Sequence, residues 1–396
     1  MKSAKQIITT ALVSLSVIAF AGECPTLSGK YIIGKSANAD FASINEATEA
    51  LNCGGVDGRV DFKIEKGIYN EKVALSAISG ASALNSITFE SVTGNNDDVV
   101  ISYASTDVTL VMNGVSYVSF ENITIDHQTA VYGNSMRVDG KASNLAFKNV
   151  IFNGVEVART GSNSAAVYFT GSAAKNDIIF DACEVNNGST GIAKGGYNAD
   201  NKDSKTTITG TLFFNQYETG LALSNEDAPV VSNNVVSSLS SYNGFKAMSF
   251  DDISGNMVIS TNVLNNANGT YGLVLNNCNS SASAFGQVSN NSINVGGNEA
   301  YGVVLTGNTD NQVLNFNRIK LSINGKMTAT QAYYKNSGTG NNINLMNCIM
   351  YDLNSGSYTI VGNTYKDYFN QLPAQSNAAM TASANGLMIE KVTAIR

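Results

Sequence analysis

The feature that most constrains the fold is an internal repeat, which is clearest in residues 299–325. An apolar strand at 301–305 leads into a polar turn, a second strand at 312–315 and a third strand around 319–323. Near-copies occupy residues 270–295 and 219–239, and all share a Gly-φ-x-φ start (φ, apolar residue) and an Asn-x-φ corner. Such a repeat indicates stacked units, because no single unit can bury its own apolar face.

The spacing of the corner indicates a parallel β-helix in which each turn of the chain, or coil, contributes three short strands. The residue after the corner recurs about once per coil, at Ile123, Val150, Val185, Val235, Val263, Ile293, Ile319 and Ile349. The wide gap after Val185 holds an additional copy at 206–215. Helical repeats would need amphipathic segments of about 10–15 residues, which the chain lacks. The sequence therefore predicts an all-β fold, a right-handed parallel β-helix of about ten coils with an N-terminal capping helix.

Composition agrees with this architecture and limits the function. The 396 residues include 36 Gly, only 3 Pro and no Trp, with 14% charged residues, as expected for short strands joined by Asn/Gly turns. The net charge of −7 is spread without a basic cluster, so we expect no nucleic-acid partner.

Residues 1–21 are typical of a secretory signal peptide. Lys2 and Lys5 precede an apolar run, and Ala19-Phe20-Ala21 forms a small-x-small cleavage site. A membrane anchor is the alternative, but the Thr and Ser residues in the run and the cleavage site favour removal. We therefore expect an exported protein, secreted or at the cell surface, with no membrane span after signal cleavage.

Export changes how the five cysteines are interpreted. Cys24 and Cys53 flank the segment before the repeats, and we predict a disulfide between them. Cys183, Cys278 and Cys348 lie in or beside repeat strands, where a thiol acts as a small buried apolar group. None has the C-x-x-C spacing of a zinc site, and we expect no metal and no cofactor.

Residues 40–52 form the one segment with helical spacing of apolar residues, and Ser43 with Glu46 makes a capping box. We expect this helix to cover the open first coil, whose strand edges would otherwise be unpaired. The resulting division is a signal peptide at 1–21, an N-terminal cap at 22–60, the β-helix at 61–360 and a C-terminal cap or tail at 361–396.

The residues ADFASINEATEAL, followed by VDFKIEKGIYNEKVAL, resemble the first coil of pectinesterases and related pectin-lyase-like β-helices. They are also similar to the opening of many exported bacterial β-helix proteins of unknown activity. The resemblance covers residues 31–102, and beyond them only the general coil pattern. It implies the β-helix fold but not an activity, because this segment is the cap and first turn in that family.

The catalytic motifs of these enzymes are missing from the chain. Pectinesterases use an arginine followed by Pro and Trp, whereas no Trp is present and no arginine precedes a proline. Residues 123–127 (ITIDH) resemble the W-I-D-H stretch of pectate lyases without its Trp. The arginine segment that supplies the lyase base is also absent. We therefore expect His127 to end a strand and to hydrogen-bond at a turn.

Polygalacturonases use N-T-D, D-D, G-H-G and R-I-K in that order. This chain has residues 308–310 (NTD), 251–252 (DD) and 318–320 (RIK) in a different order and without the histidine motif. Asp251 and Asp310 would lie about 10 Å apart, two coils away from each other, whereas inverting hydrolysis needs about 6.5–9.5 Å. We interpret these pairs, Asp97-Asp98 and the 200–203 loop as polar turns, with weak Ca²⁺ binding as the alternative.

The residue before the corner is often asparagine. The column reads Asn122, Asn149, Glu184, Asn234, Asn262, Ser292, Arg318 and Cys348. Repeated asparagine at one corner predicts an internal ladder of hydrogen-bonded amides, and we expect Asn234 and Asn262 to point inward and stack.

Tyrosines recur at one place in the last coils. Tyr271 and Tyr301 each precede the Gly that opens a strand, and Tyr333 and Tyr334 fall near that place in the next coil. Equivalent residues of neighbouring coils lie about 4.8 Å apart, so these rings should form a column. An aromatic column offers flat platforms to sugar rings; the alternative is that the rings stack only to stabilise the solenoid.

No catalytic residue is identified, so the sequence favours a secreted or surface-exposed, non-catalytic β-helix module that interacts with polysaccharide or acts as an adhesin. A divergent pectin-lyase-like polysaccharide hydrolase or lyase is the first alternative, and it requires carboxylates and an Arg or Lys that converge on one groove. A purely structural spacer or assembly subunit is the second. Polysaccharide is therefore the partner that we expect.

Overall fold

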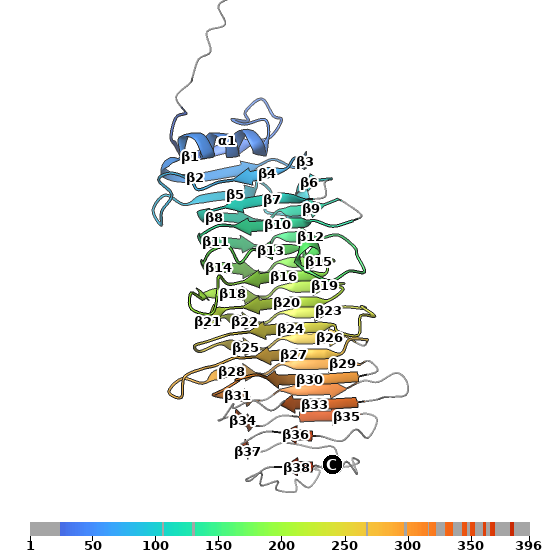
Figure 1. Cartoon of the computed structure of the whole chain (residues 1–396). Helices are drawn as coiled ribbons and strands as arrows, with labels where there is room; N and C mark the ends of the chain where they lie inside the picture. Colours follow the sequence, from blue (N-terminus) through green and yellow to red (C-terminus); the bar gives the residue numbers. More distant parts are fainter. Residues whose placement is uncertain are drawn as a thin grey trace, which may run out of the picture.

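The computed structural model of the chain forms a parallel β-solenoid of about ten coils, as the repeat predicts (Figure 1). It describes residues 24–383 except 105–106, 129–130, 267, 297–298, 316, 322–328, 336–342, 347–348, 353–358, 362–364 and 369–380, and it describes side chains as far as Ile319. The expected signal peptide, Cys348, and the side chains of Tyr333 and Tyr334 lie outside the described residues. No described helix is long and apolar enough to cross a membrane.

Each coil contributes a strand to each of three parallel sheets, which we call sheets A, B and C. In the described residues, sheet A contains β1 (Leu27–Ile33), β2 (Val56–Ile64), β5 (Ile87–Ser91), β8 (Ser116–Glu121), β11 (Ala142–Lys148), β14 (Lys175–Asp181), β18 (Thr206–Thr209), β22 (Val230–Ser232), β25 (Val258–Ser260), β28 (Gly286–Ser289), β31 (Gln312–Asn315), β34 (Ile343–Met346) and β37 (Tyr365–Tyr368). Sheet B contains β3 (Gly67–Asn70), β6 (Val99–Tyr103), β9 (Thr124–His127), β12 (Ile151–Asn153), β15 (Glu184–Asn186), β19 (Leu212–Phe214), β23 (Val235–Ser237), β26 (Val263–Asn266), β29 (Ser292–Val295), β32 (Arg318–Leu321) and β35 (Ile349–Asp352).

Sheet C contains β4 (Val73–Leu75), β7 (Val108–Asn113), β10 (Asn134–Asp139), β13 (Val167–Phe169), β16 (Thr190–Gly195), β20 (Thr219–Ser224), β24 (Lys246–Asp251), β27 (Tyr271–Asn276), β30 (Glu299–Thr306) and β33 (Ala329–Lys335). Two short parallel pairs lie outside these sheets: β17 (Asp203–Ser204) with β21 (Glu226–Asp227), and β36 (Thr359–Val361) with β38 (Thr381–Ser383). Single 3₁₀ turns occur at Asn96–Asp98 and Ser162–Ser164.

The corner from sheet A to sheet B explains the Asn-x-φ motif. One residue of each corner adopts a left-handed conformation, with φ between 50° and 61°, at Asn122, Asn149, Ala182, Gly210, Asn233, Thr261 and Asn290. Asparagine and glycine tolerate this region better than other residues. The next residue points into the core, so the chain turns within two residues.

The N-terminal helix α1 (Ile44–Gly54) covers the first coil (Figure 1). Ser43 Oγ accepts a hydrogen bond from the Glu46 N–H, and Glu46 Oε2 accepts one from the Ala42 N–H, so the predicted capping box is present. A disulfide joins Cys24 to Cys53, tying the segment before β1 to the end of the helix. Sheet A begins at β1, inside the segment that the sequence assigns to the cap.

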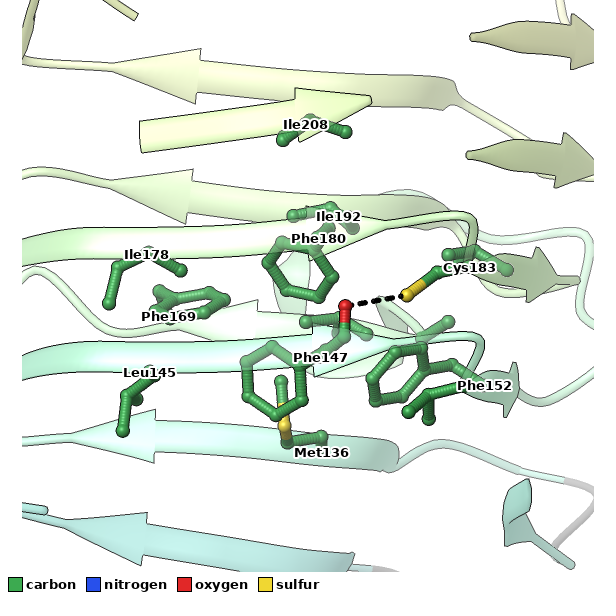
Figure 2. Close-up of a cluster of buried hydrophobic side chains, with 14 of the residues drawn as sticks. Met136, Leu145, Phe147, Phe152, Phe169, Ile178, Phe180, Cys183, Ile192 and Ile208 are labelled. Atoms are coloured by element: carbon green, nitrogen blue, oxygen red, sulfur yellow. Dashed lines mark hydrogen bonds between the residues drawn. The ribbon is translucent and has the colours of Figure 1, made fainter. Parts of the chain in front are cut away.

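The interior contains a column of stacked phenylalanines on sheet A. Its members are Phe62, Phe89, Phe120, Phe147 and Phe180, with successive ring centroids 4.8, 5.0, 6.2 and 4.8 Å apart. Phe152 and Phe169 pack edge-on against Phe180, and Figure 2 shows this part of the core. Cys183 and Cys278 are buried free thiols, as expected.

Four asparagines stack inside the C-terminal half of the solenoid: Asn234, Asn262, Asn291 and Asn317. The side-chain nitrogen of each donates to the side-chain oxygen of the next, over 3.0, 3.0 and 2.9 Å. Each also donates to a main-chain carbonyl, as Asn262 does to Val231 over 3.0 Å. The four side chains are buried, and this network satisfies polar groups that would be costly to leave unpaired.

The rest of the predicted asparagine column is offset from this ladder by one residue, although Asn149 does donate to the side chain of Asn122 over 2.8 Å. Asn122 and Asn149 occupy the left-handed position before the ladder, whereas Glu184, Ser292 and Arg318 lie one residue after it. The left-handed and inward positions are adjacent and both accept asparagine, so residue identity alone does not fix the register. In the N-terminal coils the ladder position carries other residues: Ile123, Val150, Cys183 and Thr211.

Candidate functional site

The outward face of sheet C brings the sequence-predicted tyrosines together with polar side chains. In β27, Tyr271, Val274 and Asn276 keep partial exposure while the residues between them are buried. The neighbouring strands β24 and β30 place Lys246 and Tyr301 beside Tyr271 in register. Side chains along this face therefore form rows that run parallel to the solenoid axis, about 4.8 Å per step.

Tyr271 and Tyr301 stack, as expected from their place in consecutive coils. Their ring centroids are 5.3 Å apart with an angle of 16° between the ring planes, and both side chains remain partly exposed. The glycine after Tyr271 is required by close packing. A Cβ on Gly272 would lie 2.4 Å from Ile293 Cγ2 and 2.5 Å from the carbonyl oxygen of Gly302.

Tyr333 and Tyr334 do not extend this column, which corrects the sequence prediction. Gln331 is the residue opposite Tyr301 in β33, whereas Tyr333 and Tyr334 lie opposite Val303 and Val304. The two tyrosines are therefore two and three residues too far along the strand. Their approximate sequence position suggested a match that the register does not allow.

A second tyrosine pair lies at the same edge of sheet C and was missed in the sequence. Tyr217 and Tyr242 precede β20 and β24, and their ring centroids are 5.3 Å apart. Both side chains are partly exposed. Tyr217 lies two residues before its strand and Tyr242 four residues before its strand, so the repeat spacing does not reveal the pair.

The opposite edge of the same strands carries a polar row made of Asp251, Asn276 and Thr306. Asn276 donates from its side-chain nitrogen to Asp251, and the Thr306 hydroxyl donates to Asn276 Oδ1 over 2.9 Å. Between this row and the tyrosines lie Ser249 and Val274, which make a floor without bulky or charged groups. We call this surface, with the two tyrosine pairs, the tyrosine face.

A charged cluster occupies the same sheet about 24 Å away, five strand steps toward the N-terminus. Asp107 accepts hydrogen bonds from Lys72 Nζ (2.5 Å) and Arg137 Nη1 (2.7 Å), and Arg137 Nε also donates to Asp139 (3.0 Å). The hydrogen bond from Lys72, together with the one from Arg137, holds the pKa of Asp107 below its usual range. Glycoside hydrolysis requires a general acid, that is, a carboxyl group that is protonated before the reaction. A carboxyl group that stays ionised is poorly suited to this role.

The other residues weighed in the sequence do not form a site with this cluster. His127 ends β9, is buried, and its Nδ1 lies 3.0 Å from the Thr109 hydroxyl, as expected for a structural histidine. Asp310 belongs to a row of turn residues with Asn279, apart from the row of Asp251. In the part of the chain that the structure describes, no group of three His, Cys, Asp or Glu side chains is placed to hold a metal ion.

One predicted polar turn is wrong. Asp203, at the end of the 200–203 loop, is fully buried and lies 2.6 Å from the ammonium group of Lys194. The loop folds back over the core, so Asp203 points inward. There an ion pair with Lys194 takes the place of water around its carboxylate. A charged residue in a loop is usually solvated, and this expectation failed here because β17 pairs with β21 below the surface.

Comparison with solved structures finds the same architecture elsewhere. The match to the Dettilon tailspike protein has a TM-score of 0.57 at 11% identity and covers 85% of this chain but 64% of the tailspike, which is less than two thirds of its length. PfbA, a surface adhesin of Streptococcus pneumoniae, gives a TM-score of 0.46 at 13% identity, with 83% of this chain and 86% of the adhesin covered. Pectate lyase Pel9A gives 0.38 at 13% identity, with 81% and 79% covered.

These likenesses concern the fold alone. The parallel β-helix that the first coil implies by resemblance is confirmed. No protein-family model matches the sequence, and neither does any curated protein.

Proposed function

We propose that this protein is an exported, non-catalytic β-helix module that binds a polysaccharide chain along the tyrosine face. The observation that carries the proposal is the stacked, partly exposed pair Tyr271–Tyr301 beside the polar row of Asp251, Asn276 and Thr306. A sugar has an apolar face and a rim of hydroxyl groups, so it requires aromatic or aliphatic surface next to hydrogen-bonding groups.

The geometry of the face suits an extended chain. Rows spaced by about 4.8 Å continue over several coils, so successive sugar units would meet side chains at a regular spacing. In the row of Tyr271 and Tyr301, the preceding coils carry Lys246 and Thr219. The four tyrosines line one edge, and the small residues between the edges leave the floor accessible. The disulfide between Cys24 and Cys53 supports export, because such bonds persist in oxidising compartments.

The proposal predicts that Tyr301→Ala weakens retention on an insoluble polysaccharide about tenfold, the effect of losing one central aromatic contact. Its melting temperature should stay within about 2 °C of the wild type, because one exposed aromatic pair contributes only about 0.5–1.5 kcal/mol to folding. Affinity electrophoresis or pull-down across a panel of plant, algal and bacterial polysaccharides measures the retention.

The matched control is Tyr197→Ala, since Tyr197 is 48% exposed on the loop after β16, away from the tyrosine pairs. It should leave retention unchanged. If Tyr301→Ala lowers the melting temperature by several degrees but leaves retention unchanged, the tyrosines only stabilise the fold. The same conclusion follows if no polysaccharide retains the wild-type protein.

A catalytic function is the second candidate, and the cluster of Lys72, Asp107, Arg137 and Asp139 is the observation that favours it. This cluster places two cations and two carboxylates together on the sheet that carries the tyrosine face. Prolonged incubation with the retained polysaccharide should release no new reducing ends or unsaturated products. If the wild-type protein releases products and Arg137→Ala does not, the protein is an enzyme and the proposal of a non-catalytic module is wrong.

A further inference from the structure

Lys194 occupies a core position that neighbouring coils fill with apolar residues. It lies in β16 between Phe169 of β13 and Leu223 of β20, and its side chain is fully buried. Its ammonium nitrogen lies 5.8 Å from the centre of the Phe169 ring. Lysine is almost never found at such a site without a specific chemical partner.

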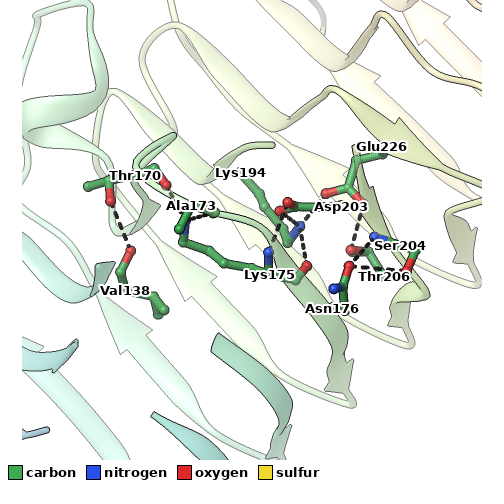
Figure 3. A network of polar contacts seen from close by, with 10 residues as sticks. All are labelled: Val138, Thr170, Ala173, Lys175, Asn176, Lys194, Asp203, Ser204, Thr206 and Glu226. Atoms are coloured by element: carbon green, nitrogen blue, oxygen red, sulfur yellow. Dashed lines mark hydrogen bonds and ion pairs between the residues drawn. The ribbon is translucent and has the colours of Figure 1, made fainter. Parts of the chain in front are cut away.

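Two carboxylates converge on this ammonium group from adjacent coils. Asp203 and Glu226 are register partners in the short β17–β21 pair, and both side chains are fully buried. Lys194 Nζ lies 2.6 Å from Asp203 Oδ2 and also donates to Glu226 Oε1 (Figure 3).

Each carboxylate is held by its second oxygen. The main-chain N–H of Lys175 donates to Asp203 Oδ1 over 2.9 Å, and the Thr206 hydroxyl donates to Glu226 Oε2 over 2.8 Å. The two acids therefore stand in fixed positions on either side of one amine, away from solvent.

Such an arrangement is costly for the folded protein. Burying ions carries a large desolvation penalty, which their mutual attraction offsets only in part. Condensation of an ammonium and a carboxylate into an amide removes one positive and one negative charge from the interior. The fold also holds the amine and the carboxyl groups in contact, so they need not meet by diffusion. Well-oriented intramolecular reactions reach effective concentrations of about 10⁵–10⁸ M.

We propose that Lys194 and Asp203 become joined by an intramolecular amide (isopeptide) bond, with Glu226 as the group that transfers the protons. The new bond forms between Lys194 Nζ and Asp203 Cγ, and the bond between Cγ and Oδ2 breaks. Of the three protons on the ammonium, one stays on the amide nitrogen. The other two pass through Glu226 to Oδ2, which leaves as water, so the reaction needs no oxidant, reductant or co-reactant.

The surroundings assign the two carboxylates to different roles. The N–H of Lys175 points at Asp203 Oδ1, the oxygen that carries negative charge when the amine adds to Cγ, so it acts as an oxyanion donor. Glu226 has no main-chain donor on either oxygen among its described hydrogen bonds. Burial raises the pKa of Glu226 against the opposing effect of Lys194, which suits a group that must both accept and release a proton.

The experiment is mass spectrometry of the purified, folded wild-type protein. Its intact mass should be lower by one water than the mass calculated from its N-terminus with the Cys24–Cys53 disulfide formed. Trypsin should fail to cleave after Lys194, and a peptide containing Lys194 should be found linked to the peptide that begins at Asp203. An unmodified mass in folded protein overturns the proposal, and a link from Lys194 to Glu226 overturns the assignment of the bond.

Variants test the role of Glu226 without removing the reacting pair. Glu226→Gln keeps the size of the side chain and should fold with Lys194 unmodified. Its intact mass should therefore equal the calculated mass, without the loss of one water. Glu184→Gln changes a surface glutamate in β15 and should form the bond as the wild type does. If Glu226→Gln forms the bond to the same extent as the control, Glu226 is not the proton-transfer group. A wild-type protein that carries the bond supports the proposal even if the Glu226 variant fails to fold.

Discussion

Replacing Lys194 by methionine is expected to lower the free energy of unfolding by about 3–5 kcal/mol at neutral pH. Methionine fills the space of the lysine side chain, but it leaves Asp203 and Glu226 as two buried carboxyl groups with no cation between them. With the proposed amide in the wild type the loss should be larger, because Lys194→Met also removes the cross-link to Asp203. Denaturant unfolding followed by circular dichroism measures the loss.

The loss should depend on pH in a defined direction. Burial raises the pKa of Glu226, and Lys194 is the main influence that lowers it. A group whose pKa is raised in the folded state favours folding at low pH, and this contribution is lost as the pH rises through the folded-state pKa. The Lys194→Met variant should therefore regain stability relative to the wild type as the pH falls from neutrality toward the usual range of glutamate.

Lys205→Met is the matched control for this prediction. Lys205 pairs with Asp177 over 3.2 Å at the surface, where its side chain is 75% exposed. Its replacement should change stability by no more than about 0.5 kcal/mol at either pH. An equal loss in the two variants, or a loss in Lys194→Met that does not change with pH, would contradict this account of the buried cluster.

Removing the disulfide with Cys24→Ser and Cys53→Ser together should lower stability by about 2–5 kcal/mol. The bridge closes a separation of 29 residues, for which the chain-entropy model gives about 3.5 kcal/mol. The bridge also anchors the capping helix, whose buried side chains Ile44, Ala47 and Leu51 cover the first coil.

Because a solenoid is stabilised coil by coil, the loss should be concentrated at the N-terminal end. Hydrogen exchange should therefore accelerate in α1 and β2 while the strands from β20 onward keep the wild-type rate. Wild-type protein treated with a reductant should behave like the double variant. Uniform acceleration along the chain, or none, would show that the bridge does not hold the cap.

The fold was predictable because its determinants are local and repeat. Every coil needs a left-handed corner, an inward apolar residue and a glycine where two backbones approach, as at Gly272, and these recur at regular intervals. The helix cap was predictable for the same reason, since Ser43 and Glu46 are three residues apart. The asparagine register failed by one residue because two adjacent corner positions accept the same side chain.

The buried ion cluster was not predicted, although the sequence contained a signal. TGIAKG at 190–195 aligns with TGLALS at 219–224, so Lys194 takes the place of a core leucine, Leu223. Its partners Asp203 and Glu226 lie on turns, where acidic residues are normally solvated. Only the three-dimensional paths of the loop between β16 and β17 and of the turn between β20 and β21 show that they point inward.

The candidate binding face was predicted in part. Tyr271 and Tyr301 could be paired because they precede equivalent glycines, and the strand register bears out that pairing. The pair Tyr217–Tyr242 and the cluster around Arg137 depend on loops of unequal length, so their neighbours in space cannot be read from their spacing in the sequence.

The central claim, that polysaccharide binds along the tyrosine face, is tested most directly by hydroxyl-radical footprinting with soluble fragments of a retained polysaccharide. At saturating fragment concentration, labelling of Tyr271 and Tyr301 should fall several-fold. Tyr197 and Tyr132, which are exposed on loops outside the two tyrosine pairs, should be labelled as in the free protein. Unchanged labelling of Tyr271 and Tyr301 together with protection elsewhere on the solenoid would contradict the claim.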